Sequence, residues 1–273
     1  MSTTPSKTET LVFSVVLFLI VFGIWQAYDL ILANFMFSAL AITIITYFVI
    51  YAICISIFAL FVKLGKSSFK EHGFKEPSRP KTHIPLSIFF VLVYIIVMLM
   101  PAFLFGFTQR SPPSFLGIIF DISRALLISL TTESIFRGYI FRNLTKNQGF
   151  FIALYASSIM FGLHGYEYPV SIMNLLAMSS DEIITEILFP QILPAFTGGL
   201  FLGYMFYKMD WSLVGPIIFR TGTLLYFSFT PFIASSPWWM AITFEVMAYA
   251  CLFVIVDSAI KEPRYRRRRF GLE

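Results

Sequence analysis

Long apolar stretches separated by short polar segments follow one another through nearly the whole chain. Several reach the ~20 residues that an α-helix needs to cross a bilayer. The pattern predicts an all-α, polytopic membrane protein, a bundle of about eight transmembrane helices forming a single transmembrane domain over residues 1–273. The expected spans lie near residues 9–28, 37–62, 86–107, 115–144, 149–165, 187–208, 211–230 and 237–259.

The composition supports this class of protein. Hydrophobic residues make up 58% of the chain and charged residues only 13%, whereas soluble domains carry about 25% charged residues. A soluble globular protein is therefore excluded. The first span is not expected to be a cleaved signal peptide, because it is long and no small-residue cleavage site follows its apolar core.

The basic residues are distributed unevenly between the two sides of the predicted bundle. With the N-terminus inside, nearly all of the 20 Lys and Arg residues fall in inner segments, and only Arg110 falls in an outer one. The positive-inside rule then places both termini in the cytoplasm. We expect the basic loop 63–85 and the basic C-terminal tail 261–273 to meet anionic lipid headgroups. Nucleic acid is not an expected partner.

Charged residues inside the predicted spans are the first candidates for function, because a charge within a bilayer is costly and usually functional. Glu133 and Arg137 lie four residues apart, so both point from one helix face. Asp121 and Arg124 are expected to neutralise each other within their helix. The other two, Arg220 and Glu245, need partners on neighbouring helices.

Of the three histidines, only His164 falls inside a span. His72 and His83 lie in the basic loop and are expected to be solvated. His164 ends an apolar helix that forms a hairpin with the helix of Glu133. Because the two residues lie at similar distances from the turn, they come to similar depths at 1.5 Å per residue. We expect His164 and Glu133 to lie near one cavity.

At these residues the chain resembles the CPBP family of intramembrane metalloproteases, also called the CAAX protease or Abi family. Its first motif is EExxxR, commonly followed by Gly. The segment Thr132-Glu133-Ser-Ile-Phe-Arg137-Gly138 fits this motif, except that Thr132 stands where the first Glu belongs.

Two further segments carry the resemblance. The family's second motif, FxxxH, is matched loosely by the segment from Ser157 to His164, where Phe161 lies three residues before the histidine. The third motif, HxxxN, follows a Gly-rich span, and Gly198-Gly-Leu-Phe-Leu-Gly203 supplies that context. At the histidine position of this third motif, however, the chain has Arg220, and at the asparagine position it has Leu224. The CPBP-like core covers about residues 115–230.

The resemblance implies a bundle of about eight helices around a polar cavity, in a protein of a prokaryotic cell membrane. In the family, a Glu and two His hold or activate a metal-bound water for peptide hydrolysis, often near the C-terminus of prenylated proteins. Carried over to this chain, Glu133, Arg137 and His164 are the catalytic candidates. The degenerate positions are Thr132, which replaces the expected general base, Arg220, which replaces a metal ligand, and Leu224, which replaces an oxyanion-stabilising group.

Three hypotheses remain open. The first is a non-catalytic relative without a cofactor, in which Arg220 supplies a positive charge to Glu133 and the protein binds a lipidated peptide or membrane partner. The second is an active zinc endopeptidase with a rearranged ligand set of Glu133, His164 and Glu245, or Glu167 in place of Glu245. The third is a transporter that uses the buried charges as a pathway.

Overall fold

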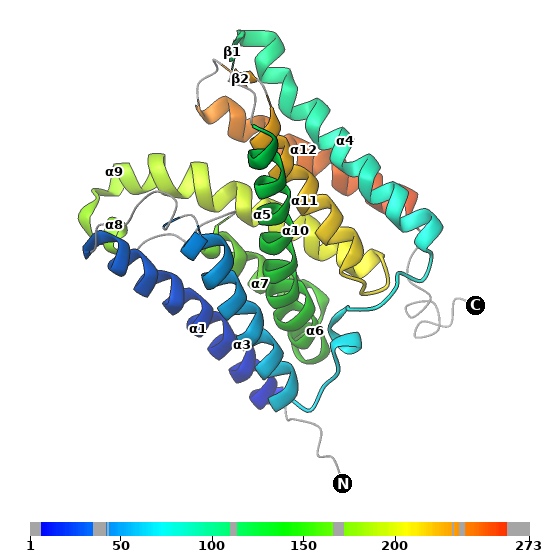
Figure 1. The fold of residues 1–273 in the computed structure, drawn as a ribbon. Helices are drawn as coiled ribbons and strands as arrows, with labels where there is room; N and C mark the ends of the chain where they lie inside the picture. Colours follow the sequence, from blue (N-terminus) through cyan, green and yellow to red (C-terminus); the bar gives the residue numbers. More distant parts are fainter. Residues whose placement is uncertain are drawn as a thin grey trace.

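The computed structural model describes residues 7–34, 42, 44–109, 114–165, 172–230, 232–234 and 238–260. Arg110, Glu167 and the basic tail 261–273 lie outside the described residues. The architecture is an all-α bundle of long apolar helices with one very small sheet, which confirms the predicted fold class (Figure 1).

The first half of the chain supplies three of the predicted spans and the start of a fourth. The elements are α1 (Lys7–Asn34), η1 (Ile45–Ile50) continuing into α3 (Tyr51–Leu64), the short η2 (Phe69–His72), α4 (Pro80–Phe105), β1 (Phe107–Gln109) and α5 (Phe115–Glu133). Helix α4 begins six residues earlier than the expected span because Pro80 suits the first turn of a helix, where its missing N–H costs nothing.

The second half begins with a continuation of α5. The elements are η3 (Ser134–Phe141), α6 (Arg142–Gln148), α7 (Phe150–His164), α8 (Ile172–Ala177), α9 (Ser180–Glu182), η4 (Ile183–Ile192), α10 (Leu193–Lys208), α11 (Val214–Phe229), β2 (Phe232–Ala234) and α12 (Trp238–Ala259). The segments η3 and η4 are wide π-helical turns, a form that is frequent at functional sites.

Among the described residues, five helical segments are long and apolar enough to cross a membrane: Thr8–Ile31, Pro80–Phe105, Phe115–Gln148, Ser180–Lys208 and Trp239–Ala259. Two shorter apolar helices are Phe48–Leu64 and Phe150–His164. Helix α11, with 16 residues, carries Arg220 in its middle. The chain is therefore an integral membrane protein.

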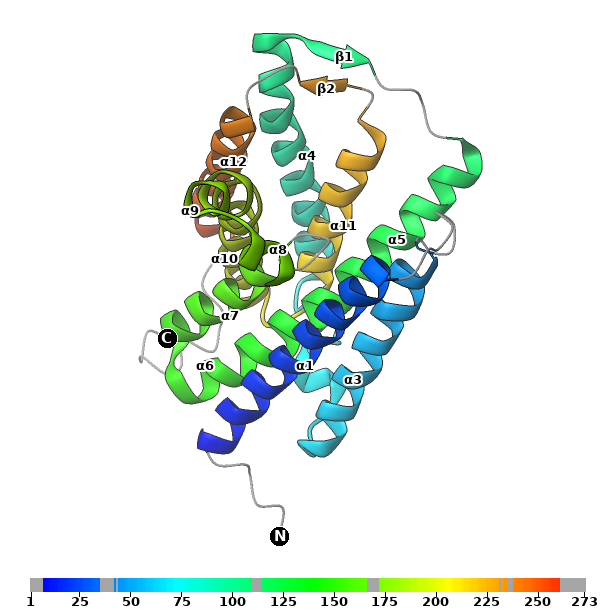
Figure 2. The ribbon, with the colours of Figure 1, turned by 90° about the vertical axis from the view of Figure 1, so that its left-hand side faces the viewer.

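Two apolar cores lie on either side of the centre of the bundle. One joins mainly α1, α3, α5, η3 and α7, and the other joins α4, α10, α11 and α12. Figures 1 and 2 show α5 between the pair α1 and α3 and the group α4, α11 and α12. At one end, β1 pairs antiparallel with β2, Phe107 opposite Ala234.

The segment 65–79, which we call the strap, crosses the opposite end of the bundle between α3 and α4 (Figure 1). Here the expectation that His72 is solvated is wrong, because it is only 1% exposed. Its Nδ1 donates to the carbonyl oxygen of Gly138 at 2.9 Å, and its Nε2 lies 2.7 Å from Ser67 Oγ. The ring also stacks on Tyr139, with centroids 5.0 Å apart.

The same expectation is wrong for His83, which is 3% exposed. The reason is the early start of α4, which places His83 in the helix rather than in the loop. Its backbone carbonyl also accepts a hydrogen bond from Ser87 Oγ at 2.7 Å. Both histidines of the basic loop are therefore parts of the folded structure.

Candidate functional site

Glu133 and two arginines form an ion-pair cluster in the middle of the bundle. Arg137 Nε lies 3.3 Å from Glu133 Oε2, and Arg220 Nη1 lies 3.8 Å from Glu133 Oε1. The exposed fractions of Glu133 and Arg220 are 0%. The structure thus brings together the two residues of the Glu-x-x-x-Arg motif and the Arg of α11.

Three elements position this cluster. Glu133 is the last residue of α5, and Arg137 follows one turn later in η3, so their side chains lie on the same face. Arg137 Nη2 also donates to the carbonyl oxygen of Gly199 on α10 at 3.1 Å. A Cβ at Gly199 would lie 3.1 Å from Ser158 Cβ and 3.2 Å from Phe161 Cδ1. The absence of a side chain at Gly199 therefore lets α10 approach α7 closely.

Phe161 of α7 lies against both guanidinium groups. Its ring centroid is 4.1 Å from Arg137 Cζ and 4.6 Å from Arg220 Cζ. The face of an aromatic ring attracts a cation, and more strongly when the cation is desolvated. The sequence marked Phe161 only as a motif position, and nothing in its spacing indicated contact with two arginines.

His164 lies at the end of α7, beside the cluster. It is buried, and edge-to-face aromatic contacts hold it between Phe136, at 5.2 Å between centroids, and Trp25 of α1, at 6.1 Å. It lies within reach of the charges of Arg137 and Arg220. Trp25 was not identified from the sequence, because an indole in an apolar span gives no functional signal.

A family model described as type II CAAX prenyl endopeptidase, Rce1-like, matches residues 112–225. The chain is CAAX-protease-like. The matched segment contains all the motif positions, from Thr132 to Leu224, and nearly coincides with the core 115–230 recognised from the motifs. No curated protein matches the chain closely enough for comparison.

The positions at which the chain departs from the CAAX-protease motifs are filled by groups of different chemistry. Thr132 is buried and its Oγ1 donates to the Ile128 carbonyl oxygen at 2.7 Å, as a helical threonine commonly does. Leu224 is buried in an apolar core. Arg220 always carries its proton and has no acceptor atom, so it is not a metal ligand.

The residues that the structure describes do not fit a zinc site. Across the described parts of the chain, no three His, Cys, Asp or Glu side chains are grouped so that they could hold a metal ion. Glu133, His164 and Glu245 are therefore not assembled as a ligand set. Glu245 lies on α12, where the hydroxyl of Tyr94 donates to its Oε1 at 3.0 Å.

The other intramembrane charges and polar groups fall into two classes. Asp121 and Arg124 form the expected pair within α5, at 3.5 Å. Three buried hydroxyls of α5 and α7, those of Ser129, Thr131 and Ser158, have no hydrogen-bond partner among the residues that the structure describes. Ser129 lies one turn before Glu133, and Ser158 lies one turn before Phe161. These three hydroxyls are thus buried groups whose hydrogen bonds are not made within the described part of the chain.

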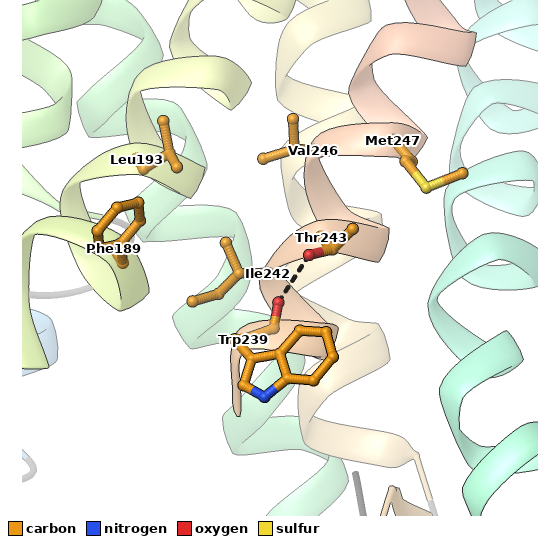
Figure 3. A pocket seen from close by; sticks show the side chains of 7 residues that line it. All are labelled: Phe189, Leu193, Trp239, Ile242, Thr243, Val246 and Met247. Carbon is orange, nitrogen blue, oxygen red and sulfur yellow. Dashed lines mark hydrogen bonds between the residues drawn. The ribbon is translucent and has the colours of Figure 1, made fainter. Parts of the chain in front are cut away.

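Two apolar grooves flank η4 and the start of α10. One, with a volume of about 460 Å³, lies against α12 and is lined by Phe189, Leu193, Trp239, Ile242, Thr243, Val246 and Met247 (Figure 3). Its only hydroxyl, that of Thr243, already donates to the Trp239 carbonyl oxygen at 2.8 Å. The second, of about 350 Å³, lies against α7. Both suit hydrocarbon rather than polar groups, and their volumes are typical of small-molecule sites.

Proposed function

We propose that this CAAX-protease-like protein is catalytically degenerate and binds a lipidated peptide or a lipidated membrane partner without cleaving it. The observation that carries the proposal is the contact between Arg220 and Glu133, with 3.8 Å between Nη1 and Oε1. A permanent cation stands where the family's motif has a metal-ligating histidine.

The charges of the cluster support this proposal. Two glutamates, one arginine and a divalent metal carry a net charge of +1. Glu133, Arg137 and Arg220 together carry the same net charge, because Thr132 removes one negative charge and Arg220 replaces two positive charges of a metal with one. The two substitutions therefore leave the net charge of the site unchanged. They also remove the metal, which would act as the Lewis acid, and the glutamate expected to act as the general base.

The surroundings of the cluster support a binding role. A lipidated peptide has a hydrocarbon chain and a polar backbone, which require different surfaces. The grooves beside η4 and α10 are apolar and open to the side of the bundle. Inside it, the hydroxyls of Ser129, Thr131 and Ser158 are buried and have no hydrogen-bond partner among the described residues. Buried polar groups of this kind are normally hydrogen-bonded, and a peptide would supply their partners.

The proposal is tested with the purified full chain and a farnesylated peptide that carries a photo-reactive group. We expect less than stoichiometric zinc, crosslinks to α5, α7, α10 or α11, and recovery of the peptide uncut. Crosslinks confined to α1 would contradict a site at the cluster. Stoichiometric zinc together with cleavage would instead support an active endopeptidase that uses Glu133 and His164.

A matched variant makes the zinc measurement decisive. Restoring the motif with Thr132→Glu, Arg220→His and Leu224→Asn places the missing donors around Glu133 and His164. Zinc needs about three protein ligands and an open position, so this variant should retain zinc after purification when the parent does not. If neither protein retains zinc, the site lacks the shape of a metal centre and the degenerate assignment rests on binding alone.

A further inference from the structure

The strap is a fixed part of the structure at its end of the bundle. The backbone N–H of Leu213 donates to the Gly73 carbonyl oxygen at 3.0 Å, and Ser212 Oγ donates to that of Lys75 at 2.9 Å. Gly73 has φ +95°, and a Cβ there would lie 2.7 Å from Phe206 Cε2. With the His72 contacts, these bonds hold the strap against η3 and the turn between α10 and α11.

Four cations of the strap and α6, which we call the strap cluster, lie within electrostatic reach of Arg142, Lys75 or His72: Lys70, Lys75, Arg142 and Lys146. Burial lowers the pKa of Lys75, and the charges of Arg142 and Lys70 act in the same direction. Burial also lowers the pKa of His72, as do the charges of Lys146 and Arg142. The acidic groups that act on His72 and Lys75 are Glu71 and Asp210. The positive charges therefore outnumber the negative ones.

Arg142 provides the specific donors of the cluster. Its guanidinium lies over the ring of Trp211, 5.2 Å from Cζ to the centroid. Its Nε and Nη1 are buried and have no hydrogen-bond partner within the described part of the chain. A guanidinium placed over a ring, with two donors unsatisfied, is well suited to bind two oxygens of a phosphate.

Exposed apolar side chains lie beside these cations. Leu64 is 58% exposed, Phe69 47% and Phe74 36%. Phe69 and Phe74 both pack against Phe58 of α3, with ring centroids 5.9 Å away. A basic segment with exposed aromatic and aliphatic residues at the end of membrane helices lies at the level of the lipid headgroups. A soluble anionic ligand would contact the cations but would leave these apolar side chains exposed.

We propose that the strap cluster binds the phosphate of an anionic phospholipid, with Arg142 as the directional donor and Lys70, Lys75 and Lys146 as further cations. The exposed Leu64, Phe69 and Phe74 contact the adjoining acyl chains. This site is separate from the proposed peptide site, since it lies at the end of the bundle.

The test measures binding of a short-chain phosphatidylglycerol to the full chain in a neutral detergent by native mass spectrometry. Because a neutral detergent offers no charged membrane surface, long-range electrostatic attraction between the basic strap and a membrane does not contribute to the measured binding. The variant Arg142→Gln with Lys146→Gln should weaken binding by about tenfold or more, the loss expected from removing charge-assisted hydrogen bonds. The control Lys63→Gln with Lys66→Gln changes the net charge equally in the same region and should leave binding nearly unchanged. Thermal unfolding without lipid checks that both variants are folded.

Three outcomes would overturn the proposal. Equal losses in the two double variants would mean a diffuse charge effect. Equal binding of phosphatidylcholine would mean that the negative headgroup is not recognised. Binding of glycerol phosphate as tight as that of the lipid would assign the site to a soluble anion. Selective loss in the Arg142 and Lys146 variant, with weak glycerol phosphate binding, supports the phospholipid.

Discussion

At the scale of single residues, the cost of buried charge explains the arrangement around Glu133. Glu133, Arg137 and Arg220 are almost completely removed from solvent, and each lies within ion-pair distance of another member. An isolated charge in such a place would be very costly. The ion pairs and the ring of Phe161 offset that cost, so the three side chains are expected to behave as one energetic unit.

The first prediction concerns Arg220. Truncating one partner of a buried pair typically costs about 3–5 kcal/mol, because the remaining charge is left without compensation. Arg220→Leu should therefore destabilise the protein by an amount in this range. Adding Glu133→Gln should recover part of the loss, as measured by unfolding in a mild detergent. If the losses of the two single variants simply add, the two residues are not energetically coupled.

The second prediction concerns Gly199. A larger side chain there would meet Ser158 and Phe161 at 3.1–3.2 Å from its Cβ and push α10 away from α7. Gly199→Leu should cost about 1–3 kcal/mol through overpacking. In α1, Gly23→Leu is a matched control, because a Cβ at Gly23 would meet no atom of the described chain within 4 Å. Similar stability losses in both variants would contradict a packing role for Gly199.

At the scale of elements, apolar patterning predicts the helices well and their ends less well. Each expected span overlaps a helical segment of the described residues, and the segment 115–144 is continuous from Phe115 to Gln148. Residues 37–41 and 43 of the expected span 37–62 lie outside the described residues. The pattern did not indicate that the strap folds back onto η3, because a basic loop with histidines has the composition of a solvated segment. The hydrogen bond to the Gly138 carbonyl oxygen, inside a π-helical turn, and the contacts with Ser67 and Tyr139 together account for the burial of His72.

The ion pairs of the candidate site could be predicted from the sequence, whereas its aromatic contacts could not. The Glu133 and Arg137 pairing follows from helix geometry, and the partnership with Arg220 follows from the motif alignment. The Phe161 ring beneath both arginines and the Trp25 contact with His164 depend on how four helices pack. Contacts between helices of this kind have no periodic signal in the sequence, since apolar aromatic residues occur on every span.

The third prediction concerns pH and the strap. Burial, followed by the charges of Lys146 and Arg142, lowers the pKa of His72, and this outweighs the hydrogen bond to Gly138 and the charge of Glu71, which raise it. The stability that neutral His72 contributes is therefore complete above about pH 6.5 and is lost as pH falls toward the lower pKa of the folded state. Amide exchange of residues 67–75, corrected for intrinsic rates, should show less protection at pH 5.5 than at pH 7.5.

The control for this measurement is His72→Gln, whose side-chain amide also donates to the Gly138 carbonyl oxygen but does not titrate. Its strap protection should depend little on pH. An identical pH dependence in the parent and the variant would mean that another group, such as Glu71, is responsible.

At the scale of the whole molecule, the charge distribution gives the fourth prediction. The basic loop and the basic tail are expected on the cytoplasmic side, and the acidic segment around Asp181 on the other. Reporter fusions at the C-terminus and after Asp181 should therefore report opposite compartments. The same compartment for both fusions would reject the eight-span model, which has an odd number of spans between Asp181 and the tail.

Arg137 and Gly138 are neighbours, and this adjacency has a thermodynamic consequence. Arg137 takes part in the ion-pair cluster, while the carbonyl oxygen of Gly138 accepts the bond from His72, and a Cβ on Gly138 would lie 2.6 Å from the His72 carbonyl oxygen. Two consecutive residues of η3 thus contact the two features, one through its side chain in the buried cluster and one through its carbonyl oxygen on the strap. If the proposed lipid shifts the strap and this shift moves Arg137, binding of the lipid and of the proposed peptide would be linked by a coupling free energy. By reciprocity, each changes the affinity of the other by the same factor.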